Sequence, residues 1–135
     1  MKVIIAEKPS LARNIKDAIG NMQSKNGYFE NSEYIITWVF GHLFSLCDIE
    51  DYEENPDYRW KIDNLPCFPE NFKFQLKKDK TKKVDAGVLK QFNLIKTLIN
   101  RPDVSEIVNA GDADREGEII VRICVNHAKE SDKPM

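Results

Sequence analysis

Acidic side chains are concentrated in the stretch NAGDADREGEII, which covers residues 109–120. Asp112 and Asp114 are separated by one residue, and in an extended turn this spacing lets both carboxylates face the same side. Together with Glu116 they would repel one another unless protons or cations held them. Oxygen ligands of this kind suit a hard divalent ion, Mg²⁺ or Mn²⁺. The alternative interpretation is a solvated acidic loop that opens a helix.

A second acidic position follows another apolar run, because Glu7 comes directly after residues 2–6. Residues 2–6 and 104–110 are rich in β-branched side chains and are predicted to be buried strands. In open parallel sheets, ligands bind beyond the carboxyl ends of the strands. If the two strands are neighbours, Glu7, Asp112, Asp114 and Glu116 converge on one edge. The alternative for Glu7 and for the adjacent Lys8 is that they cap the first helix.

The remaining pattern predicts the elements that would position these residues. A helix is expected to open at Pro9 or Ser10 and to stop at Gly20, with its apolar face formed by Leu11, Ile15, Ala18 and Ile19. Further expected elements are a polar, turn-rich segment over 21–31, a strand over 34–40, an amphipathic helix over 84–100, and a helix over 116–129 that buries Ile119, Ile120, Ile123, Cys124 and Val125. Two strand–acidic turn–helix units favour an α/β domain with a mainly parallel sheet.

The middle of the chain has no clear period. Residues 48–76 read as an irregular, aromatic-rich excursion packed onto the domain, with a short strand over 72–76. Residues 77–83 follow with five lysines and one aspartate. Such a charge run is usually a solvated loop, and phosphate contact is the functional alternative.

Length and composition set the outer limits. The 135 residues are expected to form a single domain, and the net charge of -2 gives no global argument for nucleic-acid binding. Any contact with a polyanion must therefore be local or go through bound cations. Cys47, Cys67 and Cys124 have no disulfide or zinc-site spacing, and the chain begins without a signal peptide. We expect a soluble cytoplasmic protein with reduced thiols and no membrane partner.

Three motifs carry a family resemblance. The stretches AEKPSLARNI (6–15), TWVFGHL (37–43) and NAGDADREGEII together resemble the Toprim domain of type IA DNA topoisomerases, with bacterial topoisomerase III as the most similar branch. The stretch KKVDAGVLKQFNLIKTLI is similar to the same branch with less specificity. The resemblance implies a Rossmann-like sheet flanked by helices. It also implies a single-stranded DNA substrate that is cut, passed through and resealed without ATP.

The resemblance also implies roles by position. Glu7 matches a strand-end glutamate that acts in acid–base chemistry at the 3′-oxygen and can bind metal, while Lys8 matches a lysine near the scissile phosphate. Asp112, Asp114 and Glu116 match an acidic motif that binds Mg²⁺. His42 and Arg115 match DNA-contacting positions. The alternatives are a turn histidine for His42 and a surface ion pair between Arg115 and Glu118, with Glu118 outside the site.

One departure from the family is large. Type IA enzymes are several times longer, and Tyr28, Tyr34, Tyr52 and Tyr58 do not resemble the motif of the nucleophilic tyrosine. We therefore expect an N-terminal piece of a longer, nucleoid-associated enzyme that lacks the last strand of its sheet and is inactive alone. Its partners would be DNA and the other domains of the same polypeptide. Two other classes stay open: a free-standing Toprim nuclease or primase-like protein, and a non-catalytic domain that binds nucleotide or metal.

Overall fold

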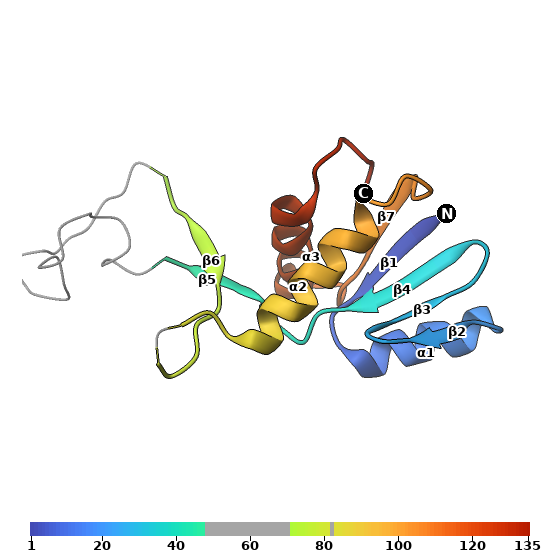
Figure 1. Cartoon of the computed structure of the whole chain (residues 1–135), viewed down its shortest axis with the longest axis horizontal. Helices are drawn as coiled ribbons and strands as arrows, with labels where there is room; N and C mark the ends of the chain where they lie inside the picture. The colour runs from blue at the N-terminus through green and yellow to red at the C-terminus, as the bar shows by residue number, and fades with distance from the viewer. Residues whose placement is uncertain (48–70, 82) are drawn as a thin grey trace, which may run out of the picture.

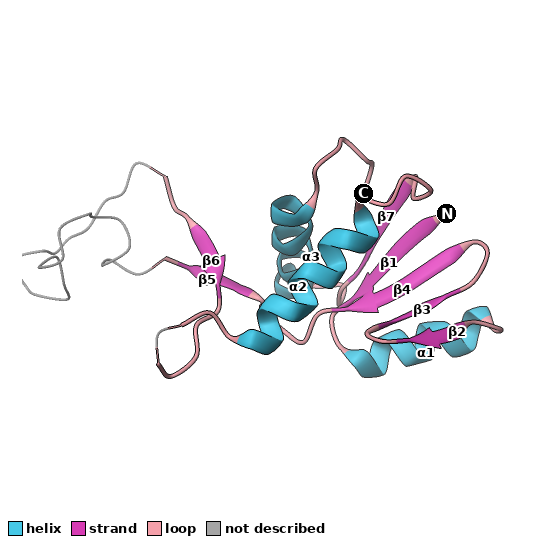
Figure 2. Cartoon of the chain, viewed as in Figure 1, coloured by secondary structure: helices cyan, strands magenta, loops and turns pink. Residues whose placement is uncertain are grey.

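A five-stranded mixed sheet forms the centre of the structure, a computed structural model that describes residues 1–47, 71–81 and 83–135 (Figures 1 and 2). The strand order is β2-β3-β4-β1-β7, and a separate ribbon pairs β5 with β6. The elements are β1 Lys2–Ala6, α1 Pro9–Ile19, β2 Gln23–Lys25, β3 Tyr28–Glu30, β4 Tyr34–Trp38, β5 Phe44–Leu46, β6 Phe74–Leu76, α2 Ala86–Ile99, β7 Glu106–Ala110 and α3 Arg115–Ala128. This confirms the predicted α/β class.

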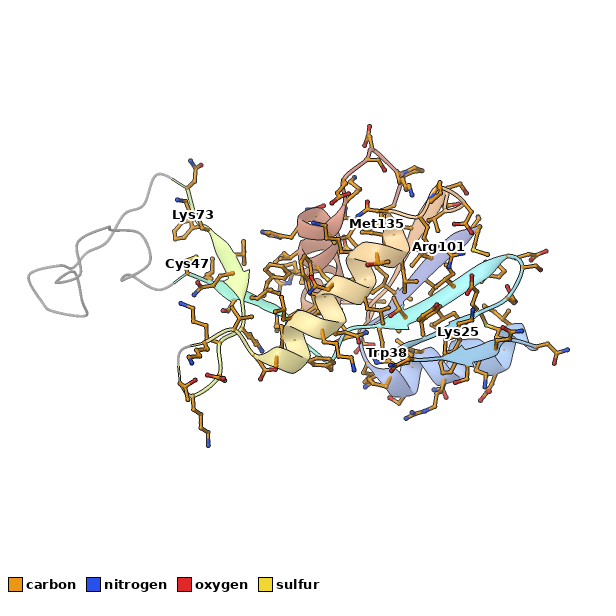
Figure 3. All side chains as sticks on the ribbon, viewed as in Figure 1. Lys25, Trp38, Cys47, Lys73, Arg101 and Met135 are labelled. Atoms are coloured by element: carbon orange, nitrogen blue, oxygen red, sulfur yellow. The ribbon has the colours of Figure 1, made fainter. Side chains whose placement is uncertain are left out.

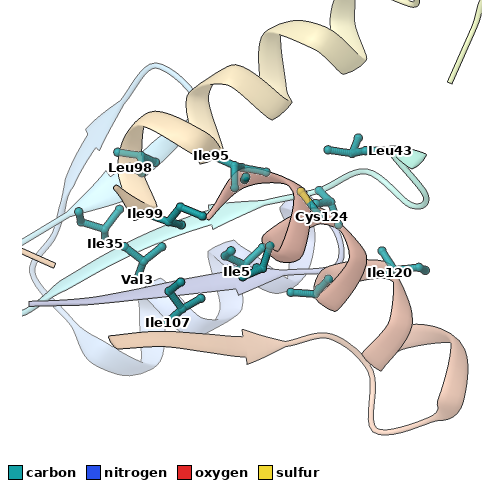
Figure 4. Packing of buried hydrophobic residues seen from close by; sticks show 14 of the residues in the cluster. Val3, Ile5, Ile35, Leu43, Ile95, Leu98, Ile99, Ile107, Ile120 and Cys124 are labelled. Carbon is teal, nitrogen blue, oxygen red and sulfur yellow. The ribbon is translucent and has the colours of Figure 1, made fainter. Parts of the chain in front are cut away.

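The central strand β1 runs parallel to both of its neighbours, β4 and β7. Its side chains alternate between the two faces, as the strand period of two requires. Val3 and Ile5 belong to the core shared with α2 and α3, whereas Ile4 and Ala6 pack with α1 on the opposite face. Figure 4 shows Val3, Ile5 and Ile107 facing residues of the two helices. The result is three layers, with one helix on one face and two on the other.

The helices bury the stripes that their spacing predicts, with two exceptions. Ala12 is buried in α1 in place of Ala18, which is exposed. Ile119 in α3 is 48% exposed, so its predicted burial was wrong. Both residues border the buried stripe, where a small shift in helix rotation decides exposure. Cys124 is fully buried, and desolvation raises the pKa of its thiol to about 12.

The segment over 21–31 was wrongly predicted to be only turn-rich, because it folds into the antiparallel hairpin of β2 and β3. Lys25 pairs with Tyr28, which leaves Asn26-Gly27 as a two-residue turn, and Gly27 has φ 90°. Asn-Gly is the strongest short hairpin signal because both turn positions need positive φ. These strands add antiparallel pairing to one side of the sheet, so the sheet is mixed.

The ribbon of β5 and β6 projects away from the sheet, with Cys47 and Lys73 toward its outer end (Figure 3). Strand β5 was not predicted, whereas β6 confirms the short strand expected over 72–76. The rest of the predicted aromatic excursion, from residue 48 to residue 70, lies outside the described residues, as does Cys67. Within the described ranges, no helix is long and apolar enough to cross a membrane.

Candidate functional site

The carboxyl ends of β1 and β7 lie side by side. The parallel register pairs Ala6 with Ala110, so Glu7 and Gly111 leave the sheet at the same level. One carboxylate oxygen of Glu7, Oε2, accepts a hydrogen bond from the backbone N–H of Asp112 at 3.0 Å. Glu7 therefore lies against the acidic loop, as expected from two neighbouring strands.

The acidic loop turns sharply because two glycines let its backbone approach α3. A Cβ on Gly111 would lie 2.3 Å from the carbonyl oxygen of Gly117, and a Cβ on Gly117 would lie 2.4 Å from that of Asp112. Contacts this short do not occur for real side chains, so both positions need glycine. The Asp114 N–H donates to the Asp112 carbonyl at 2.7 Å, which tightens the turn further.

Asp114 is the N-cap of α3. Its Oδ1 accepts from the Gly117 N–H at 2.6 Å, which satisfies one of the free donors of the first helical turn. Glu116 and Glu118 follow within that turn, where negative charge is stabilised by the helix dipole. The cap occupies one oxygen of Asp114, and Oδ2 takes no part in it.

Asn109, which the sequence analysis did not single out, connects strand, loop and helix. Its Oδ1 accepts from the Gly111 N–H at 3.0 Å, and its Nδ2 donates to the carbonyl and the carboxylate of Glu118 at 3.3 and 2.5 Å. Glu118 is also paired with Arg122. The sequence suggested an ion pair between Arg115 and Glu118. In the structure Glu118 pairs instead with Arg122, one helical turn after it. One sequence signal pointed to this bridge: Asn109 is a polar residue at the end of a buried run and precedes Glu118 by nine positions.

His42 reaches the acidic segment from a different part of the chain. It follows β4, where the Gly41 N–H donates to the Glu7 carbonyl at 3.3 Å. The Nε2 atom of His42 lies 3.2 Å from Oε1 of Glu116; the His42 side chain is partly exposed and that of Glu116 is exposed. The structure therefore brings a predicted DNA-contacting residue together with a predicted metal ligand.

Lys8 and Arg115 both stand exposed at the start of a helix. Lys8 occupies the N-cap position of α1, but its side chain makes no capping hydrogen bond. The alternative that the Lys8 side chain caps the helix is therefore wrong. Arg115 is the first residue of α3 and lines an open hollow together with Asp112 and Asp114. Glu118 and Asn109 line the same hollow. Glu118 therefore borders the site, although its carboxylate is turned toward Asn109 and Arg122.

The carboxylates do not converge on one point in this arrangement. Across the described parts of the chain, no three His, Cys, Asp or Glu side chains are grouped so that they could hold a metal ion. The Glu7 carboxylate accepts from the Asp112 N–H, the Asp114 carboxylate accepts from the Gly117 N–H, and Glu116 pairs with His42. Each of these is an oxygen donor, as Mg²⁺ requires, but Glu7 and Glu116 would have to turn from their present partners to share an ion.

The family model of the Toprim domain matches residues 2–134, which is almost the whole chain. The chain belongs to the Toprim domain family. The parallel β1–β7 pair, with Glu7 at one strand end and the acidic loop at the other, is consistent with that assignment. The predicted family membership is confirmed.

Several relatives of this Toprim domain are named DNA topoisomerase 3. The chain is 42% identical over 127 residues to the protein from Bacillus cereus and 41% identical over the same length to that from Bacillus anthracis. It is 40% identical over 124 residues to that from Staphylococcus aureus. These matches cover 92–94% of the chain but 16% of each relative. The Toprim domain described here thus corresponds to about a sixth of their length.

Proposed function

We propose that this Toprim domain is the metal-binding catalytic part of a type IA DNA topoisomerase III. Such an enzyme cuts one DNA strand, passes another strand through the break and reseals it without ATP. The observation that carries the proposal is the contact of Glu7 with the acidic loop across adjacent strands. The identity of about 41% to proteins named DNA topoisomerase 3 supports the choice of branch.

The chemistry assigned to Glu7 is proton transfer. When a tyrosine oxygen bonds to phosphorus, the bond from phosphorus to the 3′-oxygen breaks, the phenol loses a proton and the 3′-oxygen gains one. Glu7 would deliver that proton to the 3′-oxygen and take it back during resealing, while the phenol proton passes to solvent. The phosphodiester energy is kept in the phosphotyrosine bond, which is why no ATP is needed. The tyrosine would come from other domains of the same polypeptide.

The other residues bind and orient the DNA. Lys8, adjacent to Glu7 and exposed, would neutralise the non-bridging oxygens of the scissile phosphate. Arg115 would contact a neighbouring phosphate, and His42 would contact DNA once it separates from Glu116. The enzyme would act on nucleoid DNA in the cytoplasm.

A divalent ion fits the donor set at this edge. Asp112, Asp114 and Glu116 would hold Mg²⁺, Glu7 would be a further ligand in the steps in which it does not carry the proton, and Mn²⁺ accepts the same oxygen ligands. A bound Mg²⁺ would supply charge neutralisation where phosphate oxygens approach four carboxylates. The free Oδ2 of Asp114 allows this residue to bind metal without giving up its helix cap.

The proposal is tested by replacing the matched region of Bacillus cereus DNA topoisomerase 3 with this chain. The chimera should relax negatively supercoiled plasmid with Mg²⁺, and Asp112→Asn with Asp114→Asn should abolish relaxation. The matched control, Asp132→Asn, removes one exposed acid near the end of the chain and should leave relaxation unchanged. Metal-dependent nicking by the 135-residue chain alone would contradict the topoisomerase assignment and favour a free-standing nuclease.

A further inference from the structure

A second cluster of charge, this one basic, lies outside the acidic site. Residues 71–83 contain six lysines and one aspartate, in a chain whose net charge is -2. Within this stretch we call residues 77–81 and 83 the basic loop. It connects the outer ribbon to α2, and the acidic site described above uses none of its side chains.

The ribbon before the basic loop has one apolar and one polar face. Phe44 pairs with Leu76, and both pack on the core; Leu46 and Phe74 continue the same face outward. Ser45 and Gln75 form the next pair, so their side chains point to the opposite face. By the same alternation Lys73 and Lys77 belong to that polar face. Its charge is therefore directed away from the core.

The basic loop is hydrogen-bonded to the segment that leaves the acidic site after His42. The Lys77 N–H donates to the carbonyl of Leu43, the residue after His42, at 2.9 Å, and the Asp85 N–H donates to the Lys77 carbonyl at 2.9 Å. Figure 1 shows the ribbon leaving the end of the sheet to which the arrows of β1 and β4 point. The lysines therefore begin where the chain leaves the site.

The single acid of the basic loop is used to fold the loop itself. The Asp79 carboxylate accepts from the N–H groups of Thr81 and Lys83 at 2.8 and 3.3 Å, and the Asp79 N–H donates to the Lys83 carbonyl at 2.7 Å. These bonds close a tight turn. These hydrogen bonds restrain the backbone at Lys80 and Lys83, which lowers the entropy cost of binding a ligand there.

Several lysines elsewhere in the described chain have carboxylate partners, although Lys8, Lys16 and Lys90 make no ion pair with any described residue. Lys25 pairs with Glu30, Lys96 with Glu130 and Lys129 with Asp132. By contrast, Lys77, Lys80 and Lys83 are exposed and make no ion pair with any described residue. Three exposed lysines close together in the sequence are suited to a polyanion.

We propose that the basic loop binds the phosphates of the single-stranded DNA segment that runs away from the acidic site, through Lys77, Lys80 and Lys83. This inference rests on the proposed function, because the site determines where the strand starts. The loop would add binding of the DNA backbone that does not depend on base sequence. Contacts of this kind orient a strand without reading its bases.

The test measures binding of a fluorescein-labelled oligothymidylate to the 135-residue chain by anisotropy, in EDTA and at several salt concentrations. The triple variant Lys77→Gln, Lys80→Gln, Lys83→Gln should bind about tenfold more weakly near 0.1 M salt, and its salt-dependence slope should fall by about 2, as expected for three lost phosphate contacts. The control triple Lys25→Gln, Lys96→Gln, Lys129→Gln removes the same charge from the paired lysines and should bind like the wild type. Circular dichroism checks that both variants fold.

The outcomes separate this inference from the proposed function. Equal affinity of the two triple variants, or equal competition by polyglutamate and by unlabelled oligonucleotide, would overturn the DNA path over the basic loop. Absence of binding by the unmodified chain at low salt would overturn it as well. None of these results changes the relaxation assay with the chimera, and that assay tests the acidic site separately.

Discussion

Glu7 and Asp112 are separated by more than a hundred positions in the chain, yet the Glu7 carboxylate accepts a hydrogen bond from the Asp112 backbone at 3.0 Å. The contact exists because β1 and β7 are adjacent and parallel, with Ala6 opposite Ala110. It places a candidate proton donor directly beside the candidate metal-binding loop.

Glu7→Gln tests the proton-transfer role. Glutamine keeps the size and the acceptor oxygen for Asp112 but cannot donate an acidic proton. We expect the chimera to lose strand cleavage by about 10²–10⁴-fold, the usual contribution of a general acid, while oligonucleotide binding persists. Cleavage is measured on a labelled oligonucleotide. Glu33→Gln, at the opposite end of the sheet, is the control, and an unchanged rate for Glu7→Gln would remove Glu7 from the chemistry.

Asp114→Asn separates metal binding from helix capping. Asparagine caps a helix about as well as aspartate, so stability without metal should be nearly unchanged. Ten times the dissociation constant of Mg²⁺ should stabilise the wild type by about 1.4 kcal/mol, and this gain should be strongly reduced in the variant. Urea unfolding with and without MgCl₂ measures both quantities. A full Mg²⁺ gain in Asp114→Asn would exclude this residue as a ligand.

Asn109→Ala tests the bridge between β7 and α3. The substitution removes one acceptor and one donor group, and we expect the free energy of unfolding to fall by about 1–3 kcal/mol. Because the acidic loop loses its anchor at Gly111, the apparent affinity for Mg²⁺ should fall as well. Calorimetric titration reports the second effect. Asn126→Ala, on the exposed side of α3, is the control, and equal behaviour of the two variants would refute the bridge.

Gly117→Ala tests the close approach of the acidic loop to α3. A methyl group there would lie 2.4 Å from the Asp112 carbonyl oxygen, so the loop must move. We expect a loss of about 1–3 kcal/mol, typical of overpacking, together with weaker Mg²⁺ binding. Gly87→Ala in α2 is the matched control; its nearest contact is 3.3 Å from an aspartate side chain. A stable Gly117→Ala with wild-type Mg²⁺ affinity would contradict the packing argument.

Glu30 gives the structure a defined dependence on pH. Burial alone would raise the pKa of Glu30, but hydrogen bonds and charge from Arg101 and Lys25 outweigh it and lower this pKa below its ordinary 4.5. The ionised form therefore stabilises the folded state fully above about pH 4.5, and the benefit disappears as pH falls through the lower folded-state pKa. Wild type should exceed Glu30→Gln in stability at pH 7, and the difference should shrink below pH 4.5. Urea unfolding at a series of pH values measures it, and a constant difference would refute the coupling.

The strongest sequence predictions concerned elements with a clear local period. The strand at residues 2–6 and the helix that stops at Gly20 were predicted with their observed bounds because β-branched runs and helix-end signals are local. The hairpin over residues 21–31 was missed, although Asn26-Gly27 signalled it. Its strands have only three residues each, and they are stabilised by the pairing of β3 with β4 and of β2 with β3 rather than by their own pattern.

The sequence by itself determined which residues could do the chemistry: an acid after each of two buried runs, and a close Asp-x-Asp-x-Glu spacing. These are local properties of type and order. Only the tertiary structure decided that β1 and β7 are adjacent, that His42 contacts Glu116, and that Asn109 connects the loop to α3. Such contacts join residues that are distant in the chain or lie in different elements. They depend on strand order and helix packing, which are set by burial of the whole core rather than by any one segment.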